Sequence, residues 1–119
     1  MSELVSPPPP VGLSPGLVPL YEEAQAVSDR SPASACALLR LLLRAVLRER
    51  RRTGRHLLHD VQTLVDEGAP VSLLRALDVM GMTEDQARHP GEIVLTDGHG
   101  EAQNLFMFVN LLVDQTSPT

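Results

Sequence analysis

The sequence SPASACALLRLLLRAVLRER, residues 31–50, contains the longest amphipathic helix that this chain predicts. Ser31 is a favoured N-cap residue, and Pro32 suits the first helical position because its missing N–H would have no partner there. Apolar residues then recur every three or four positions, as a buried helical stripe requires; they are Ala35, Leu38, Leu39, Leu42, Ala45 and Val46. We therefore expect a helix from Pro32 to about Arg50 at the centre of the core.

Four shorter stretches on either side of this helix also predict helices. Their approximate bounds are residues 20–28, 55–66, 70–80 and 100–115. Gly68 suits the end of one of these helices, and Asp97 can cap the last one. Aromatic residues make up only 3% of the chain, so Leu, Val and Ala must build the core, which favours helices over a β-sandwich. The sequence therefore predicts an all-α fold, an antiparallel bundle of four to five helices.

Proline divides the chain into a tail and one helical domain. Residues 7–10 are all proline, and such a run cannot enter a helix interior. We therefore expect residues 1–19 to form a proline-rich flexible tail, of which residues 1 to about 15 pack little. Residues 20–115 are expected to form the helical domain, and residues 116–119 a disordered C-terminus.

Composition and charge limit the classes of protein to which this chain can belong. Its 119 residues suffice for one domain with one modest core. The net charge of −5 argues against general binding of polyanions. The single cysteine, Cys36, cannot form an internal disulfide and suits a reducing compartment. No apolar run is long enough to span a membrane, and the N-terminus lacks the pattern of a signal peptide. We expect a cytoplasmic protein that does not contact membranes.

Arginine gives the strongest signal for binding. Seven of the ten arginines fall within the sixteen positions from Arg40 to Arg55, and Arg40, Arg44 and Arg48 recur every four residues. An edge of this kind suits phosphates or an acidic protein partner. The residues assigned to it are Arg40, Arg44, Arg48, Arg51, Arg52 and Arg55. The alternative is a solvated face on which the arginines pair with acids such as Glu49 and Asp60.

Histidine supplies the remaining candidates for chemistry. His89, next to Arg88, is the best candidate for a catalytic group, and the alternative is a helix-end side chain that bonds backbone carbonyls. His56 and His59 lie one helical turn apart with Asp60 beside them. A solvated pair is favoured over a metal site there, because no further ligand has suitable spacing. The chain has no nucleotide-binding glycine motif. We expect no metal and no cofactor.

The last predicted helix carries apolar residues on more than one face. One stripe holds Leu105, Phe108, Val109 and Leu112. A second group points substantially elsewhere and comprises Phe106, Met107 and Leu111. A small helical chain cannot bury all of these side chains internally, so we expect the protein to form a homodimer.

Four short motifs resemble a known family. They are Tyr21–Ala24, Ser31–Ala35 leading into Leu38–Arg40, Leu77–Gly81 and His89–Ile93. Together they resemble a prokaryotic HEPN-like domain (higher eukaryotes and prokaryotes nucleotide-binding), in particular the family of unknown function that occurs alone or attached to restriction-enzyme subunits. The resemblance covers about residues 20–115. It implies an antiparallel helical bundle, frequent dimerisation and a setting in phage defence or RNA metabolism.

The chain departs from this family at residues that catalysis would need. Active HEPN ribonucleases carry an Arg and a polar residue shortly before a His, but here Asp78 stands where that Arg would fall and Met82 where an Asn would. A carboxylate at Asp78 would repel the phosphate of RNA. Arg88 does not replace the missing cation, because neighbours on a helix project about 100° apart. The departure argues against catalysis.

The resulting hypothesis is a non-catalytic helical interaction module. It self-associates and docks on a protein or ribonucleoprotein partner in a prokaryotic or phage defence or counter-defence setting. Two alternatives stay open. One is a metal-independent HEPN-type endoribonuclease that uses His89, and the other is a nucleic-acid-binding accessory protein that uses the Arg40–Arg55 edge.

Overall fold

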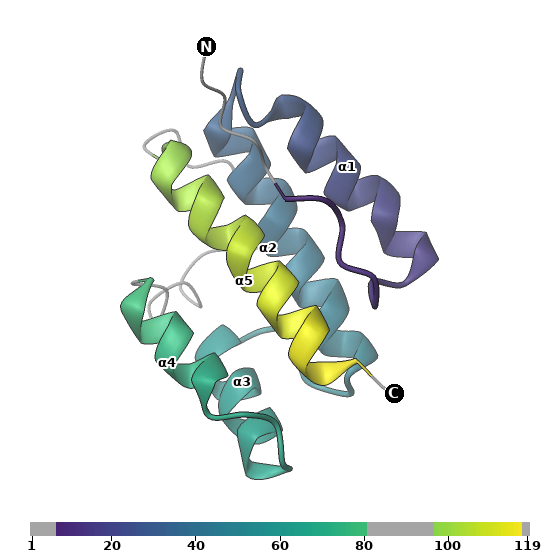
Figure 1. The fold of residues 1–119 in the computed structure, drawn as a ribbon, viewed down its shortest axis with the longest axis vertical. Coiled ribbons are helices and arrows are strands. Elements are labelled where there is room, and N and C mark those ends of the chain that lie inside the picture. Colours follow the sequence, from purple (N-terminus) through teal and green to yellow (C-terminus); the bar gives the residue numbers. More distant parts are fainter. Residues whose placement is uncertain (1–6, 81–96, 118–119) are drawn as a thin grey trace.

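The computed structural model describes residues 7–80 and 97–117, and every regular element within them is a helix. In chain order they are the 3-10 helix η1 (Pro15–Leu17), α1 (Val18–Val27), α2 (Pro32–Glu49), α3 (Leu57–Asp66), α4 (Ser72–Val79) and α5 (His99–Thr116) (Figure 1). The predicted all-α bundle of four to five helices is confirmed. None of these helices is both long and apolar enough to cross a membrane.

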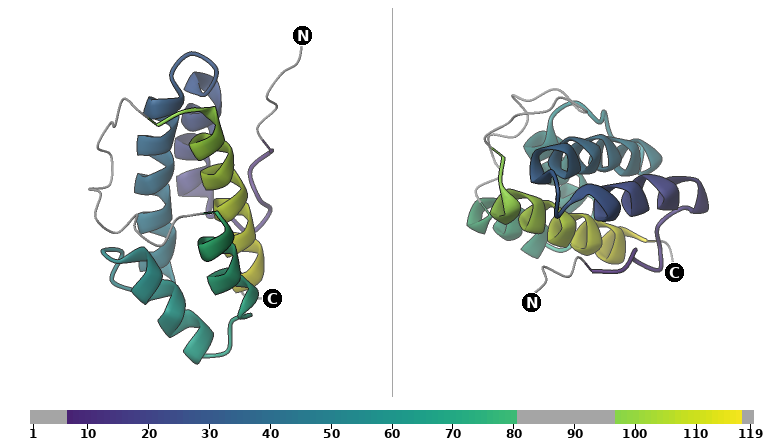
Figure 2. Two further views of the ribbon diagram at one scale, coloured as in Figure 1. Left: turned by 90° about the vertical axis from the view of Figure 1, so that its left-hand side faces the viewer. Right: turned by 90° about the horizontal axis from the view of Figure 1, so that it is seen from above.

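Helix α2 lies at the centre of the bundle, with α1 and α5 packed against it and the α3–α4 pair at the end where α2 finishes (Figures 1 and 2). Helices α1 and α2 are antiparallel, as expected. Helix α5, however, runs in the same direction as α2 (Figures 1 and 2). Accordingly, Arg50, directly after α2, donates a hydrogen bond of 2.9 Å from its Nε to Oγ1 of Thr116, the last residue of α5. The antiparallel expectation therefore does not extend to α2 and α5.

The predicted start of α2 is confirmed. The Ser31 side chain accepts a hydrogen bond of 3.2 Å from the Ser34 backbone N–H, and Pro32 occupies the first turn. This contact satisfies one of the helix N–H groups that have no partner within the helix. Leu39, Leu42 and Val46 of the apolar stripe are fully buried. Each contributes about 1.5–3 kcal/mol by leaving water, so α2 is held mainly by its packed face.

The second apolar group of α5 is divided between the core and the surface. Phe106 is buried, with 2% of it exposed, and its ring meets that of Tyr21 edge to face at 5.5 Å. Tyr21 of α1 thus contacts the side of α5 that carries Phe106 and Asn110. Met107 remains 54% exposed and Leu111 partly so. The expected homodimer stays a prediction, and it now has fewer exposed apolar residues on α5 to bury.

A buried ion pair fixes the beginning of α5. Asp97 accepts a bond of 2.8 Å from Nη1 of Arg40 in α2, and the two side chains are 3% and 9% exposed. The expectation that Asp97 caps α5 is wrong, since its carboxylate faces α2 instead. Gly98 is the N-cap residue, and its N–H donates to Oε1 of Glu101 at 2.9 Å. The glutamate thus supplies the local capping contact.

The proline-rich N-terminus packs against the bundle more closely than expected. We call residues 7–14 the strap. Leu13 is buried with 6% of its surface exposed, and the Pro7 carbonyl accepts hydrogen bonds from Tyr21 Oη and Gln25 Nε2, both at 2.8 Å. The expectation of little packing is therefore wrong for the strap, because one apolar anchor and paired side-chain donors hold it.

The first and last helical residues of the bundle differ from the predicted bounds of 20 and 115. Helix α1 begins at Val18, so the helical part starts before residue 20. At the other end, Thr116 belongs to α5 and the Ser117 hydroxyl donates to the Val113 carbonyl. The rest of the expected disordered C-terminus, residues 118–119, lies outside the described residues.

Replacing Leu13 by Ala tests the packing of the strap. Removing a buried isobutyl group costs about 2 kcal/mol or more when the site is well packed. We therefore expect Leu13→Ala to lower the free energy of unfolding in urea by about 2 kcal/mol. Val11→Ala, two residues away at a fully exposed position, is the control and should change it by less than about 0.5 kcal/mol. Equal effects of the two substitutions would show that the strap does not pack in solution.

Candidate interaction surface

Arg40 does not belong to the exposed arginine edge. Each step of four residues along an α-helix turns 40° beyond a full turn, so Arg48 lies about 80° around α2 from Arg40. This rotation carries Arg40 toward the beginning of α5, where it pairs with Asp97. Its expected role as a surface contact is wrong because it is buried.

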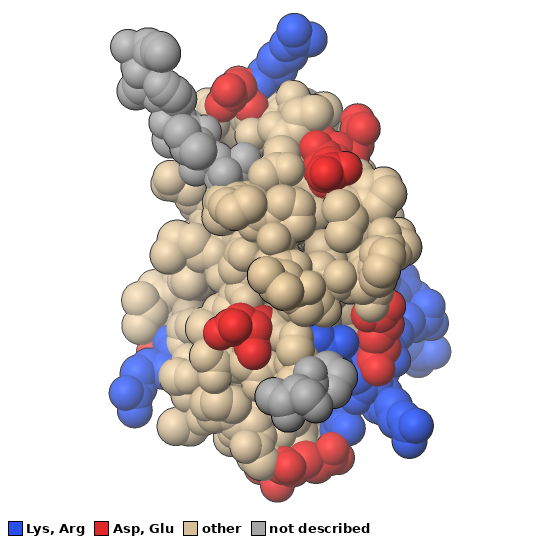
Figure 3. Space-filling model, turned by 45° about the vertical axis from the view of Figure 1, so that its right-hand side comes forward, with Lys and Arg blue, Asp and Glu red and all other residues tan. Residues whose placement is uncertain are grey.

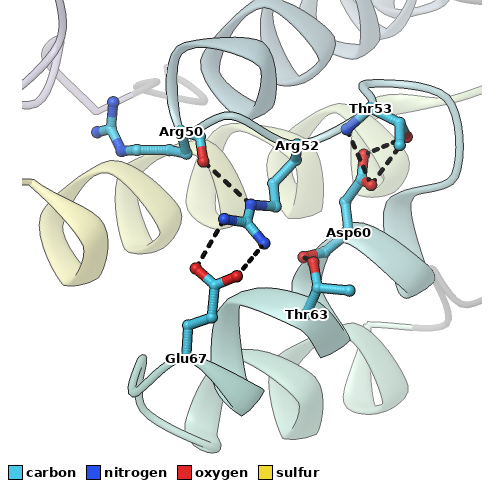
Figure 4. Close-up of polar contacts among 6 residues, drawn as sticks. All are labelled: Arg50, Arg52, Thr53, Asp60, Thr63 and Glu67. Atoms are coloured by element: carbon cyan, nitrogen blue, oxygen red, sulfur yellow. Dashed lines mark hydrogen bonds and ion pairs between the residues drawn. The ribbon is translucent and has the colours of Figure 1, made fainter.

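Arg52 is tied into the end of the bundle by its own contacts. Its guanidinium bonds both carboxylate oxygens of Glu67, at 2.9 and 2.7 Å, while its Nε donates to the Arg50 carbonyl at 3.0 Å (Figure 4). The bond from Arg52 lowers the pKa of the Glu67 carboxyl, and the same bond raises the pKa of Arg52. All three nitrogens of the Arg52 guanidinium therefore already have a hydrogen-bond partner within the fold, so this side chain is not available to bind a partner.

The loop between α2 and α3 is organised by a carboxylate that the sequence did not single out for this role. Asp60 is buried and accepts bonds from the Thr53 N–H at 3.2 Å and the Thr53 hydroxyl at 2.8 Å (Figure 4). It also accepts a bond of 2.7 Å from the Gly54 N–H. His56 and His59 are exposed. The three side chains therefore do not form the metal site considered for them. The sequence did contain a signal for this role, because Asp60 is an acidic residue among the apolar residues Leu57, Val61 and Leu64 of the predicted helix.

Arg44 is partly buried beneath this loop. Gly54 has a φ of +74°, and a Cβ placed there would lie 3.0 Å from Cγ of both Arg44 and Arg48. Only glycine allows the loop to pass this closely over the two side-chain stems. The Nε of Arg44 is buried and has no hydrogen-bond partner among the residues that the structure describes. The loop thus packs against the aliphatic stems of both arginines. The Arg48 side chain is still exposed, whereas Arg44 is only partly exposed.

Arg51 adopts a backbone conformation that normally belongs to glycine. Its φ is +64°. The N–H of Arg51 donates to the Arg48 carbonyl at 3.0 Å, and the N–H of Arg52 donates to the Leu47 carbonyl at 2.8 Å. This pattern is a Schellman motif with arginine at the left-handed position. A non-glycine residue there costs about 1–2 kcal/mol. A strained position of this kind points to a use for the side chain that it carries.

Three arginines remain exposed at this end of the molecule, and we call Arg48, Arg51 and Arg55 the basic corner. Within residues 7–80 and 97–117, none of their side chains makes a hydrogen bond or an ion pair. Figure 3 shows basic side chains concentrated toward the end where α2 and α5 finish. Arg51 and Arg55 lie in the loop whose backbone Asp60 holds at Thr53 and Gly54, so the backbone that carries these two side chains has a defined conformation.

The other predicted site residues divide into two groups. His89 and Arg88 lie outside the described residues, so the structure does not bear on the proposed catalytic pair. Cys36 is fully buried in α2, and Asp78 is exposed on α4. Among the described residues, no three His, Cys, Asp or Glu side chains cluster in a way that could hold a metal ion.

Comparison of the chain with protein-family models, with curated proteins and with solved structures finds no match. The HEPN-like assignment therefore stays a prediction from the sequence motifs.

The Arg52–Glu67 pair predicts a small acid-dependent loss of stability. Since the pKa of Glu67 lies below its usual value of 4.5, the pair stabilises the fold above that pH and loses this effect as the pH falls through the lowered pKa. We expect the wild-type protein to have a higher urea midpoint than Glu67→Gln at pH 7, with the difference disappearing as the pH falls through the lowered pKa of Glu67. Asp66→Asn, at a neighbouring exposed acid, should not reproduce this change. A difference that persists unchanged at low pH would contradict the assignment.

Proposed function

We propose that this protein is a non-catalytic helical interaction module that docks on an acidic protein partner through its basic corner. The observation that carries the proposal is Arg51. Glycine would relieve the strained backbone at this position, yet an exposed arginine occupies it. Arg48 and Arg55 are exposed beside it, and the loop that joins them is fixed by Asp60. Three exposed guanidinium groups suit carboxylates, which each can bind with two parallel hydrogen bonds.

An acidic protein fits this corner better than a nucleic acid does. The whole chain has a net charge of −5, so a long polyanion would be repelled by most of the surface. A protein that presents a few carboxylates can contact the corner alone. Single-stranded nucleic acids also stack on exposed aromatic rings. Tyr21, Phe106 and Phe108, the only aromatic residues in the chain, are all buried.

The biological setting of the proposal follows from the sequence. The resemblance to HEPN-like domains suggests a prokaryotic or phage defence or counter-defence system, a cytoplasmic location and a homodimer. A ribonucleoprotein partner is compatible with docking through its protein component. The alternative activity, a metal-independent ribonuclease that uses His89, is separated from this proposal by the experiment below.

The test compares two charge reversals of equal size. The probe is a labelled 20-residue helical peptide with glutamates at i and i+4, titrated by fluorescence anisotropy at several salt concentrations. We expect Arg48→Glu/Arg55→Glu to weaken binding at least about tenfold and to flatten its salt dependence. Arg30→Glu/Arg75→Glu, at two exposed positions outside the corner, should stay within about twofold. Equal losses in the two double variants would overturn the proposal.

Arg51→Gly separates a structural role from a binding role. Glycine should raise the free energy of unfolding by about 1 kcal/mol, because it removes the strain of the left-handed conformation. We expect the same variant to bind the acidic peptide several-fold more weakly. A gain in stability with unchanged binding would remove Arg51 from the proposed site.

Two further outcomes would replace the proposal. Tighter binding of a 20-nucleotide RNA than of the acidic peptide, through the same arginines, would favour the nucleic-acid-binding alternative. Degradation of that RNA without metal, abolished by His89→Ala, would favour the ribonuclease.

A further inference from the structure

The strap is held as a bound peptide would be, by side chains that belong to other elements. Tyr21 and Gln25 lie one turn apart on α1, and both donate hydrogen bonds of 2.8 Å to the Pro7 carbonyl. The Tyr21 hydroxyl in turn accepts a bond of 2.7 Å from Asn110 of α5. Proline has no backbone N–H, so a run of prolines offers carbonyl acceptors and no donors. Side-chain donors of the kind that Tyr21 and Gln25 supply are therefore suited to bind it.

Two further anchors fix the position of the strap. Leu13 enters the core, and its N–H donates to the Pro10 carbonyl at 3.0 Å. At Gly12 the backbone passes so close to α5 that a Cβ would collide with the Ser117 side chain. The strap therefore fits a defined path between a carbonyl site at one end and an apolar pocket at the other.

The space around the strap is largely apolar. A groove of about 810 Å³ lies between the strap and α5, and it is bordered by Pro7, Pro10, Val11, Met80, Met107 and Leu111. Pro7 and Pro10 both border it, which is the three-residue spacing at which prolines share one side of a polyproline helix. A proline run of this length loses little chain entropy on binding, because its φ angles are already fixed.

We propose that α1 and α5 form a binding site for a proline-rich segment of a partner protein, and that the chain occupies this site with its own strap. The recognition elements are the donors Tyr21 and Gln25, oriented by Asn110, and the pocket filled by Leu13. A partner segment with the pattern of several prolines followed by a leucine competes with the strap for the same contacts. The strap has a high effective concentration because it is joined to α1 through η1, so it limits access to partners that bind tightly.

The experiment uses the full chain and a labelled peptide with the sequence of residues 7–14, Pro-Pro-Pro-Pro-Val-Gly-Leu-Ser. In the wild-type protein the strap competes with this peptide. Leu13→Ala weakens the strap but leaves the site intact. We expect Leu13→Ala to bind the peptide at least about tenfold more tightly than the wild-type protein does, because its competitor has lost an anchor.

Matched variants test the contacts themselves. Adding Gln25→Ala or Tyr21→Phe to Leu13→Ala should weaken peptide binding at least about fivefold, because each removes a donor to the prolyl carbonyl. Adding Glu23→Gln, at an exposed position on the same helix, should have no effect. A peptide in which alanines replace the four prolines should bind more weakly than the original.

Three results would overturn the proposal. The first is no peptide binding by Leu13→Ala, and the second is equal binding by the wild-type protein and Leu13→Ala. The third is concentration-dependent dimers of Leu13→Ala that exclude the peptide, which would assign the site to the strap of a second copy. Arg48→Glu/Arg55→Glu should leave peptide binding unchanged, so this proposal and that of the basic corner can fail separately.

Discussion

The buried ion pair between Arg40 and Asp97 constrains the rest of the bundle. Removing two charges from water is costly, and only a close and well-satisfied contact offsets that cost. The pair therefore ties the beginning of α5 to Arg40 of α2. From there α5 runs along α2 until Thr116 meets Arg50. This course places Phe106 against Tyr21, and Asn110 within reach of the hydroxyl that holds the strap. The position of the strap thus depends on the same contact.

Helix geometry divides one run of arginines between structure and surface. Arg40 is rotated into the bundle, and Arg52 turns back beyond the end of α2 to bond Glu67. Arg48, Arg51 and Arg55 are left exposed around a loop that a buried carboxylate holds in place. The run therefore contains arginines that pair with acids inside the bundle and arginines that stay exposed. The docking surface that we propose is smaller than the full edge and more rigid.

The sequence predicted what depends on neighbouring residues and missed what depends on distant ones. Ser31 and Pro32 start α2 through local contacts, and the apolar period correctly marks its buried face. Arg40 and Asp97 are 57 positions apart, so no local pattern identifies them as partners. Leu13 and Val11 are both apolar residues after the proline run, and only the tertiary structure distinguishes the buried Leu13 from the exposed Val11. Which arginines of the Arg40–Arg55 run are exposed likewise depends on the tertiary structure.

A double-mutant cycle on Arg40 and Asp97 tests this account most directly. Arg40→Met, Asp97→Asn and the double variant are each unfolded in urea, together with the wild-type protein. Each single substitution removes one charge of this pair and leaves the opposite charge buried, whereas the double substitution removes both charges. We predict that the double variant loses less stability than the two single variants combined, by about 1.5 kcal/mol or more. Effects that add to within about 0.5 kcal/mol would show that the two residues act independently, and would contradict the central role of the pair.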